Sequence, residues 1–161
     1  MLKKAYEYLE NVTPLKSDCG KLCGGACCEG DGEIWLLPGE EELFRDLDGF
    51  EIKSDEGEYN LVCKTSCRDN RKIRPFGCRI FPYFPIVEEK NGRVHIRLVL
   101  DPRGSMCPLA KGEARCGRDF ERAVRRATRL LVQDKKYMDF FVSYGSLIEE
   151  IADFKEKILN K

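Results

Sequence analysis

The chain has 161 residues, of which 42% are hydrophobic and 35% charged, a composition typical of one soluble globular domain. Its 28 basic and 28 acidic side chains give a formal net charge of zero, so no global field favours a nucleic acid or a membrane surface as partner. We expect a single domain over residues 1–161, with a cysteine-cluster core at 17–110 and C-terminal helices at 116–161.

The N-terminal residues MLKKAYEYLENV alternate charged with apolar side chains and predict an amphipathic helix over 2–10. They lack the continuous apolar core of a signal peptide, and no apolar run reaches the roughly 20 residues that span a bilayer. The sequence therefore predicts a cytoplasmic protein with no membrane partner. In a reducing cytosol, its nine cysteines indicate metal binding or reactive thiols rather than a disulfide framework.

A glycine-rich cysteine loop follows the first helix, and EIWLL at 33–37 predicts a short strand. PGEEELFRDLDG then predicts a helix that begins near Pro38, carries acidic residues in its first turn and ends before Gly49. The runs FEIKS and EYNLVC flank the turn DEG and predict a hairpin over 50–63. RPFGCRIFPYFP contains three prolines, so we expect a loop or a single helical turn over 74–85.

YFPIVEE and RVHIRLVL flank KNG and predict a second hairpin over 83–100. His95, the only histidine, shares the polar face of its strand with Arg97, which favours exposure to solvent over a metal or catalytic role. Apolar side chains then recur at three- and four-residue spacing from Phe120 to Leu131 and again over 145–160. Both repeats predict helices that bury their stripes in the core. The expected fold is a small metal-stapled α+β domain with two β-hairpins, irregular cysteine loops and packing helices at both ends.

Four cysteines fall within the ten residues CGKLCGGACC. The glycines of this segment argue against a helix, and its free backbone N–H groups favour a loop around an ion. Adjacent residues in an extended segment project in opposite directions, so Cys27 and Cys28 would serve two sites more easily than one. Eight cysteines suffice for two four-sulfur sites, which suit zinc or iron–sulfur clusters. Because no C-x2-C pair occurs, iron–sulfur ranks slightly ahead of zinc.

The same residues resemble the cysteine-cluster family of zinc- or iron-chelating domain proteins. The likeness rests on CGKLCGGACC, on EIWLLPGEEELF, on RPFGCRIFP (74–82) and on CPL at Cys107, and it covers roughly residues 17–110. The chain departs from the family pattern in the short spacing between Cys63 and Cys67 and in the lack of a tyrosine before RP. Cys116 is therefore an alternative to Cys63 or Cys67 as a ligand. The resemblance implies eight metal ligands: Cys19, Cys23, Cys27, Cys28, Cys63, Cys67, Cys78 and Cys107.

The resulting hypothesis is a metal-binding protein in which zinc or an iron–sulfur cluster has a structural, redox or accessory role, with an unidentified protein as partner. Arg74 and Arg79 flank Cys78 and would offset thiolate charge at such a centre. The sequence favours a non-enzymatic role, since sulfur ligands and one surface histidine offer no general base. One alternative is an accessory domain of a methylase-like system, because some flagellin lysine methylases carry a similar domain.

Nucleic-acid binding through an arginine-rich helix is the second alternative. It is the weaker one, because acidic residues dilute the helix face and no aromatic residues interleave with the arginines. The arginines concerned are Arg118, Arg122, Arg125, Arg126 and Arg129.

Overall fold

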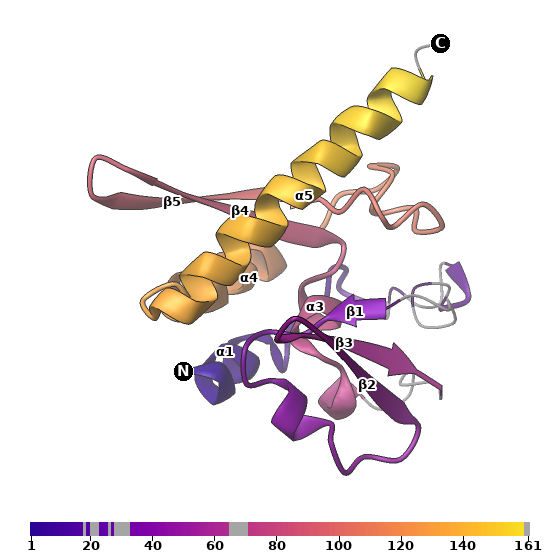
Figure 1. Ribbon diagram of the computed structural model, residues 1–161. Coiled ribbons are helices and arrows are strands. Elements are labelled where there is room, and N and C mark those ends of the chain that lie inside the picture. The colour runs from indigo at the N-terminus through magenta and orange to yellow at the C-terminus, as the bar shows by residue number, and fades with distance from the viewer. Residues whose placement is uncertain (18, 20–22, 26, 28–32, 65–70, 160–161) are drawn as a thin grey trace.

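The computed structural model describes residues 1–17, 19, 23–25, 27, 33–64 and 71–159. In this part of the chain the protein is an α+β fold with four α-helices, two short 3-10 helices and two antiparallel sheets (Figure 1). The helices are α1 (Leu2–Leu9), η2 (Glu41–Leu43), η3 (Arg71–Ile73), α3 (Phe76–Ile80), α4 (Arg118–Leu131) and α5 (Lys135–Leu159). The strands are β1 (Glu33–Trp35), β2 (Phe50–Asp55), β3 (Glu58–Cys63), β4 (Tyr83–Lys90) and β5 (Arg93–Leu100).

Strands β1, β3 and β2 form a three-stranded antiparallel sheet with β3 in the centre. The hairpin predicted over 50–63 is confirmed, and its turn holds Glu56 and Gly57 at φ values of 48° and 88°. Two successive positive φ values give a turn whose twist matches that of the flanking strands. Leu61 on β3 is fully buried and packs with Leu36 and Phe44 in a small core of its own.

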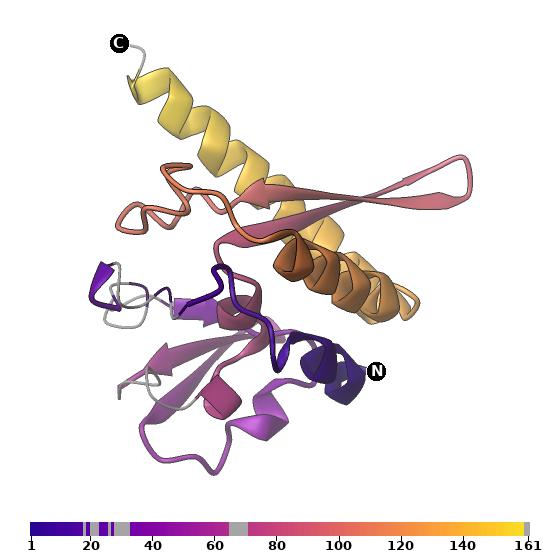
Figure 2. The ribbon, with the colours of Figure 1, turned by 180° about the vertical axis from the view of Figure 1, so that it is seen from behind.

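Strands β4 and β5 form the second predicted hairpin, closed by Asn91 and Gly92, both at positive φ. Helix α5 packs on β4 and α4 on β5, while α1 packs on α4 (Figures 1 and 2). Gly145 lies where α5 meets β4, and a Cβ there would contact Ile86 Cδ1 at 3.5 Å. His95 is exposed on β5, as the sequence predicts.

The helix predicted from Pro38 to Gly49 is wrong. The chain forms only the three-residue η2 helix and turns in this segment. Gly39, inside the predicted helix, adopts a positive φ of 86°, which an α-helix does not allow. A turn at Gly39 directs the Glu40 side chain into the interior, where it is fully buried.

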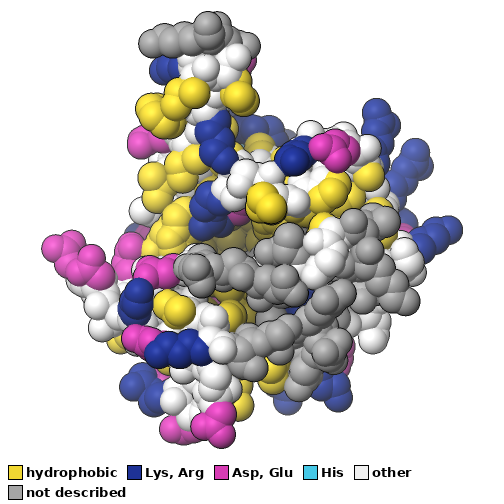
Figure 3. Space-filling view, turned by 90° about the vertical axis from the view of Figure 1, so that its right-hand side faces the viewer, with side chains coloured by type: hydrophobic (Ala, Val, Ile, Leu, Met, Phe, Trp, Pro, Cys, Tyr) yellow, Lys and Arg dark blue, Asp and Glu magenta, His cyan; other side chains and the backbone are white. Residues whose placement is uncertain are grey.

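The last helix is longer than predicted and less buried. It begins at Lys135 rather than near Gly145, and only its first part is covered. Ile148 is 1% exposed, whereas Phe154 and Ile158 are 64% and 56% exposed, so the prediction that the whole apolar stripe is core was wrong. The reason is length, because α5 continues beyond the hairpin that it covers (Figures 1 and 3). None of the helices in the described ranges combines the length and apolar character that crossing a bilayer requires.

Candidate metal centre

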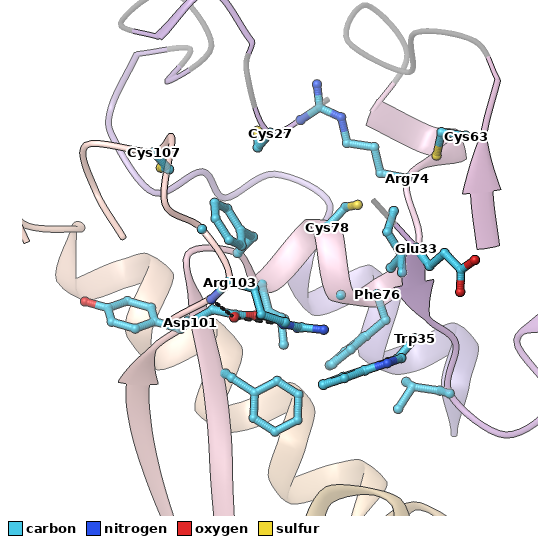
Figure 4. A pocket seen from close by; sticks show the side chains of 18 of the residues that line it. Cys27, Glu33, Trp35, Cys63, Arg74, Phe76, Cys78, Asp101, Arg103 and Cys107 are labelled. Atoms are coloured by element: carbon cyan, nitrogen blue, oxygen red, sulfur yellow. Dashed lines mark hydrogen bonds and ion pairs between the residues drawn. The ribbon is translucent and has the colours of Figure 1, made fainter. Parts of the chain in front are cut away.

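A cavity of about 310 Å³ is lined by residues of β1, α3, β4, α5 and the segment that follows β5. Four cysteines contribute to its wall: Cys27, Cys63, Cys78 and Cys107. In the view of Figure 4 the four cysteines lie above Trp35, Phe76 and the Asp101–Arg103 pair. The fold therefore places in the wall of one cavity four thiols drawn from positions 27 to 107 of the sequence.

Each of these cysteines comes from a different kind of segment. Cys27 is exposed in the glycine-rich loop, and Cys63 is the last residue of β3, opposite Phe50 on β2. Cys78 is in α3. Cys107 is buried in a series of turns after β5, where its N–H donates to the Gly104 carbonyl at 3.0 Å. A bound group on this side of the cavity would link a strand, a helix and two loops.

The remaining predicted ligands are placed differently. Cys19 and Cys23 are not among the described residues that line the cavity; Cys23 Sγ lies 4.0 Å from the carbonyl oxygen of Cys19. Cys28 and Cys67 lie outside the described residues. Within the described ranges, no three His, Cys, Asp or Glu side chains are grouped closely enough to hold one metal ion. A centre at the cavity would therefore need Cys28 or Cys67, a shift of thiol rotamers, or a group larger than one ion.

The position of Cys78 is fixed by a buried carboxylate. Glu40 is 0% exposed and accepts the backbone N–H of Phe76 at 2.5 Å and that of Leu37 at 2.8 Å. The hydroxyl of Tyr6 donates to the same carboxylate. Burial raises the pKa of Glu40 and also that of Tyr6. Because Phe76 opens α3, this carboxylate ties the helix that carries Cys78 to both α1 and the end of β1.

Arg79 extends this arrangement through its contact with Tyr6. It is 5% exposed and donates from Nε to the Arg74 carbonyl and from Nη2 to the Lys72 carbonyl, both at 2.8 Å. Its guanidinium carbon lies 4.4 Å from the centre of the Tyr6 ring, and burial lowers its pKa. Arg74 lines the cavity together with the four cysteines. Arg79 does not, because its hydrogen bonds fold the RPFGCR segment instead.

The opposite wall of the cavity is aromatic and was not found from the sequence. The Arg103 guanidinium lies 3.7 Å over the Trp35 ring and is held by Asp101, to which Nε donates at 2.9 Å. Trp35 also contacts the Tyr144 ring, with centroids 4.3 Å apart. The pair belongs to the sequence DPRG, which is typical of an ordinary turn. Only the packing of β1 against this turn shows that the pair forms part of the cavity wall.

The arginines of α4, suggested as a nucleic-acid surface, are largely engaged within the protein. Arg122 pairs with Asp119, and Arg125 donates to the Ile96 carbonyl at 2.6 Å. The Arg126 guanidinium lies 4.1 Å over the Tyr8 ring. The contacts of Arg125 and Arg126 join α4 to β5 and α1, whereas the Arg122–Asp119 pair lies within α4 and is exposed.

The cysteine side of this cavity is the best candidate for a functional site, because the chain places four thiols, Arg74 and an aromatic wall around one space. Comparison with protein-family models, with curated proteins and with solved structures gave no match. The chemistry of the site is therefore argued from its own residues.

Proposed function

We propose that this protein holds a thiophilic metal centre, an iron–sulfur cluster or zinc, at the cysteine side of the cavity. The observation that carries the proposal is that Cys27, Cys63, Cys78 and Cys107 line one space although they come from four separate segments. Thiolates select zinc and iron–sulfur clusters, whereas calcium and magnesium need oxygen ligands. The resemblance of the cysteine motifs to zinc- or iron-chelating domains supports the same conclusion.

The spacing of the donors fits an iron–sulfur cluster better than one zinc ion, because no three donors among the described residues are grouped closely enough for a single ion. A cluster also holds its cysteine sulfurs further apart than one ion does, because several iron atoms and sulfides lie between them. Arg74 at the cavity wall would offset part of the charge that thiolates bring.

Such a centre would have a clear structural role. It would join β3, α3 and the turns around Cys107, so that the small sheet and the second hairpin are held together through sulfur as well as through side-chain packing. With such a centre the fold would be metal-stapled, which is what the sequence predicts. An iron–sulfur cluster would in addition supply one-electron transfer beside the aromatic wall formed by Trp35, Phe84 and Phe140.

The test is metal and sulfide analysis of the full chain purified without oxygen. We expect a brown protein with broad visible absorption and equal amounts of iron and acid-labile sulfide. Cys78→Ser should lose the colour and most of the iron. Met106→Leu is the matched control, since Met106 lines the same cavity and carries a sulfur that cannot become a thiolate. A colourless wild type that contains zinc would select the zinc form of the proposal, and a wild type without either metal would overturn it.

A further inference from the structure

The last part of α5 extends beyond the rest of the protein and leaves apolar side chains exposed (Figure 3). Leu147, Phe154 and Ile158 are 40%, 64% and 56% exposed, and Ile151 between them is half-buried. Because each residue of an α-helix turns the chain by about 100°, these four side chains lie within about 60° of the helix circumference. They therefore form one continuous apolar strip, called here the α5 strip.

The spacing of the α5 strip is that of a coiled-coil seam. Its residues are separated by 4, 3 and 4 positions, which is the alternation of the d and a positions in a heptad repeat. Ile151 and Ile158 take a positions, and Leu147 and Phe154 take d positions. Isoleucine at a combined with leucine at d favours two parallel helices. The strip thus has the pattern of a helix that pairs with another helix.

Towards the start of α5, residues of the same register already pack within the protein. Phe140 and Tyr144 occupy the preceding d and a positions, and the Tyr144 ring lies 4.3 Å from that of Trp35 between centroids. This packing anchors the helix in the fold. The α5 strip is therefore presented on a helix that is already formed, so that association does not include the cost of nucleating one.

The charged residues beside the strip make it complementary to itself. Glu150 flanks the strip on one side and Lys155, five positions later, flanks it on the other. In two parallel helices in register, Glu150 at g of one helix meets Lys155 at e of the other, and this pair occurs twice. An antiparallel arrangement of the same strips would instead place Lys155 opposite its own copy. Lys155 also donates to the Pro102 carbonyl, and its ammonium group has two further donors for such a pair.

A lipid surface fits the same segment less well. Residues 149–159 carry four acidic and two basic side chains, whereas a helix that lies on an anionic membrane is rich in lysine and arginine. The acidic residues are Glu149, Glu150, Asp153 and Glu156, and the basic ones are Lys155 and Lys157.

We propose that the α5 strip pairs with the α5 strip of a second copy, so that the protein forms a parallel two-helix dimer through the free end of α5. The occupant follows from the charges, since one chain supplies both members of the Glu150–Lys155 pair. The seam is short, so we expect a reversible dimer with a Kd on the order of 10 µM. This inference goes beyond the proposed function and requires no bound metal.

The experiment is sedimentation velocity of the full chain over about 1–500 µM, with a reductant that excludes disulfide-linked dimers. We expect the wild type to pass from monomer to dimer over this range. Phe154→Glu places carboxylates in the seam and should raise the dimer Kd about 10-fold or more. Leu159→Glu is the matched control, because Leu159 is 83% exposed but lies outside the strip, and its Kd should stay within about 2-fold of wild type. A wild type that stays monomeric, or equal effects of the two variants, would overturn the proposal.

A charge swap tests both the occupant and the orientation. Glu150→Lys alone sets two lysines against each other at both pairs and should raise the dimer Kd about 5-fold, and Lys155→Glu alone should do the same. The double variant restores opposite charges in the parallel dimer and should return the Kd to within about 2-fold of wild type. The parallel dimer would be refuted by a double variant that associates no more tightly than the single ones. Binding of a monomeric wild type to vesicles of phosphatidylcholine and phosphatidylserine would refute the second copy as occupant.

Discussion

Cys78 and Cys107 reach the same cavity from segments that are held in place by different forces. The Cys78 segment depends on a fully buried carboxylate, Glu40, whose hydrogen bonds connect α1, the end of β1 and the start of α3. The Cys107 segment depends on local turn hydrogen bonds and on close packing. A Cβ on Gly104 would come within 2.6 Å of the Phe81 ring and 2.8 Å of Ala110.

This difference teaches that one cavity can be built from a charged network on one side and from steric fit on the other. The charged side responds to loss of a hydrogen-bonding partner and to pH, because buried polar groups are costly when they are left unsatisfied or ionised. The packed side is destabilised by added volume, because atoms there are already in contact. Substitutions on the two sides of the cavity should therefore have different effects.

The largest effect is expected from Glu40→Ala. This change leaves the N–H groups of Phe76 and Leu37 buried without their acceptor, and it removes the partner of the Tyr6 hydroxyl. We expect the free energy of unfolding to fall by about 3 kcal/mol or more, measured by urea denaturation. Glu42→Ala is the control, since Glu42 is exposed and its ion pair is with the equally exposed Arg45, and it should leave stability unchanged. Similar stability of the two variants would mean that Glu40 does not anchor α3.

Gly104→Ala should have the next largest effect. The added methyl group displaces the Phe81 ring or the turn that carries Cys107, and we expect a loss of about 1–3 kcal/mol in unfolding free energy. Gly145→Ala adds the same methyl group at an ordinary distance of 3.5 Å from Ile86, within a helix that favours alanine. That control should be neutral or slightly stabilising. If Gly104→Ala were as stable as the wild type, close packing would not be what fixes the position of Cys107.

The pH dependence should distinguish the two sides directly. Burial raises the pKa of Glu40 above its ordinary value of 4.5, with Tyr6 and Arg79 as the ionisable groups that face it. The contribution of this carboxyl to stability is complete below its ordinary pKa and is lost as pH rises through the higher folded-state value. Relative to Glu40→Gln, the wild type should therefore lose stability with rising pH, by at most about 1.4 kcal/mol per pH unit. The loss of unfolding free energy caused by Gly104→Ala should stay constant over the same pH range.

The smallest effect is expected at the far wall of the cavity. Arg103→Gln removes the side-chain bonds to Asp101, but Arg103 is about one-third exposed and its backbone N–H still donates to Asp101 at 2.9 Å. We expect a loss of about 1 kcal/mol or less in chemical denaturation. Arg45→Gln, which breaks a pair exposed on both sides, should cause no measurable change. A loss as large as that of Glu40→Ala would show that the buried Asp101 carboxylate anchors the segment of Cys107 as Glu40 anchors α3.

The sequence predicts the local structure of this protein well where one turn or one periodic stripe decides it. Both hairpins follow from residues that adopt positive φ, such as Asn91 and Gly92, and α4 follows from the repeat that begins at Phe120. The prediction fails at Gly39, where a helix-like pattern of acidic residues is overridden by the turn that buries Glu40. It also fails for the end of α5, since periodicity does not show how far the rest of the protein extends.

For the candidate site, the sequence by itself predicts sulfur as the metal donor, because it carries nine cysteines and a single histidine. Only the tertiary structure decided which thiols face the same space. Cys27, Cys63, Cys78 and Cys107 line one cavity. Side-chain identity is local, whereas the approach of distant segments depends on packing and on single contacts such as the bond from Gly117 to Pro14.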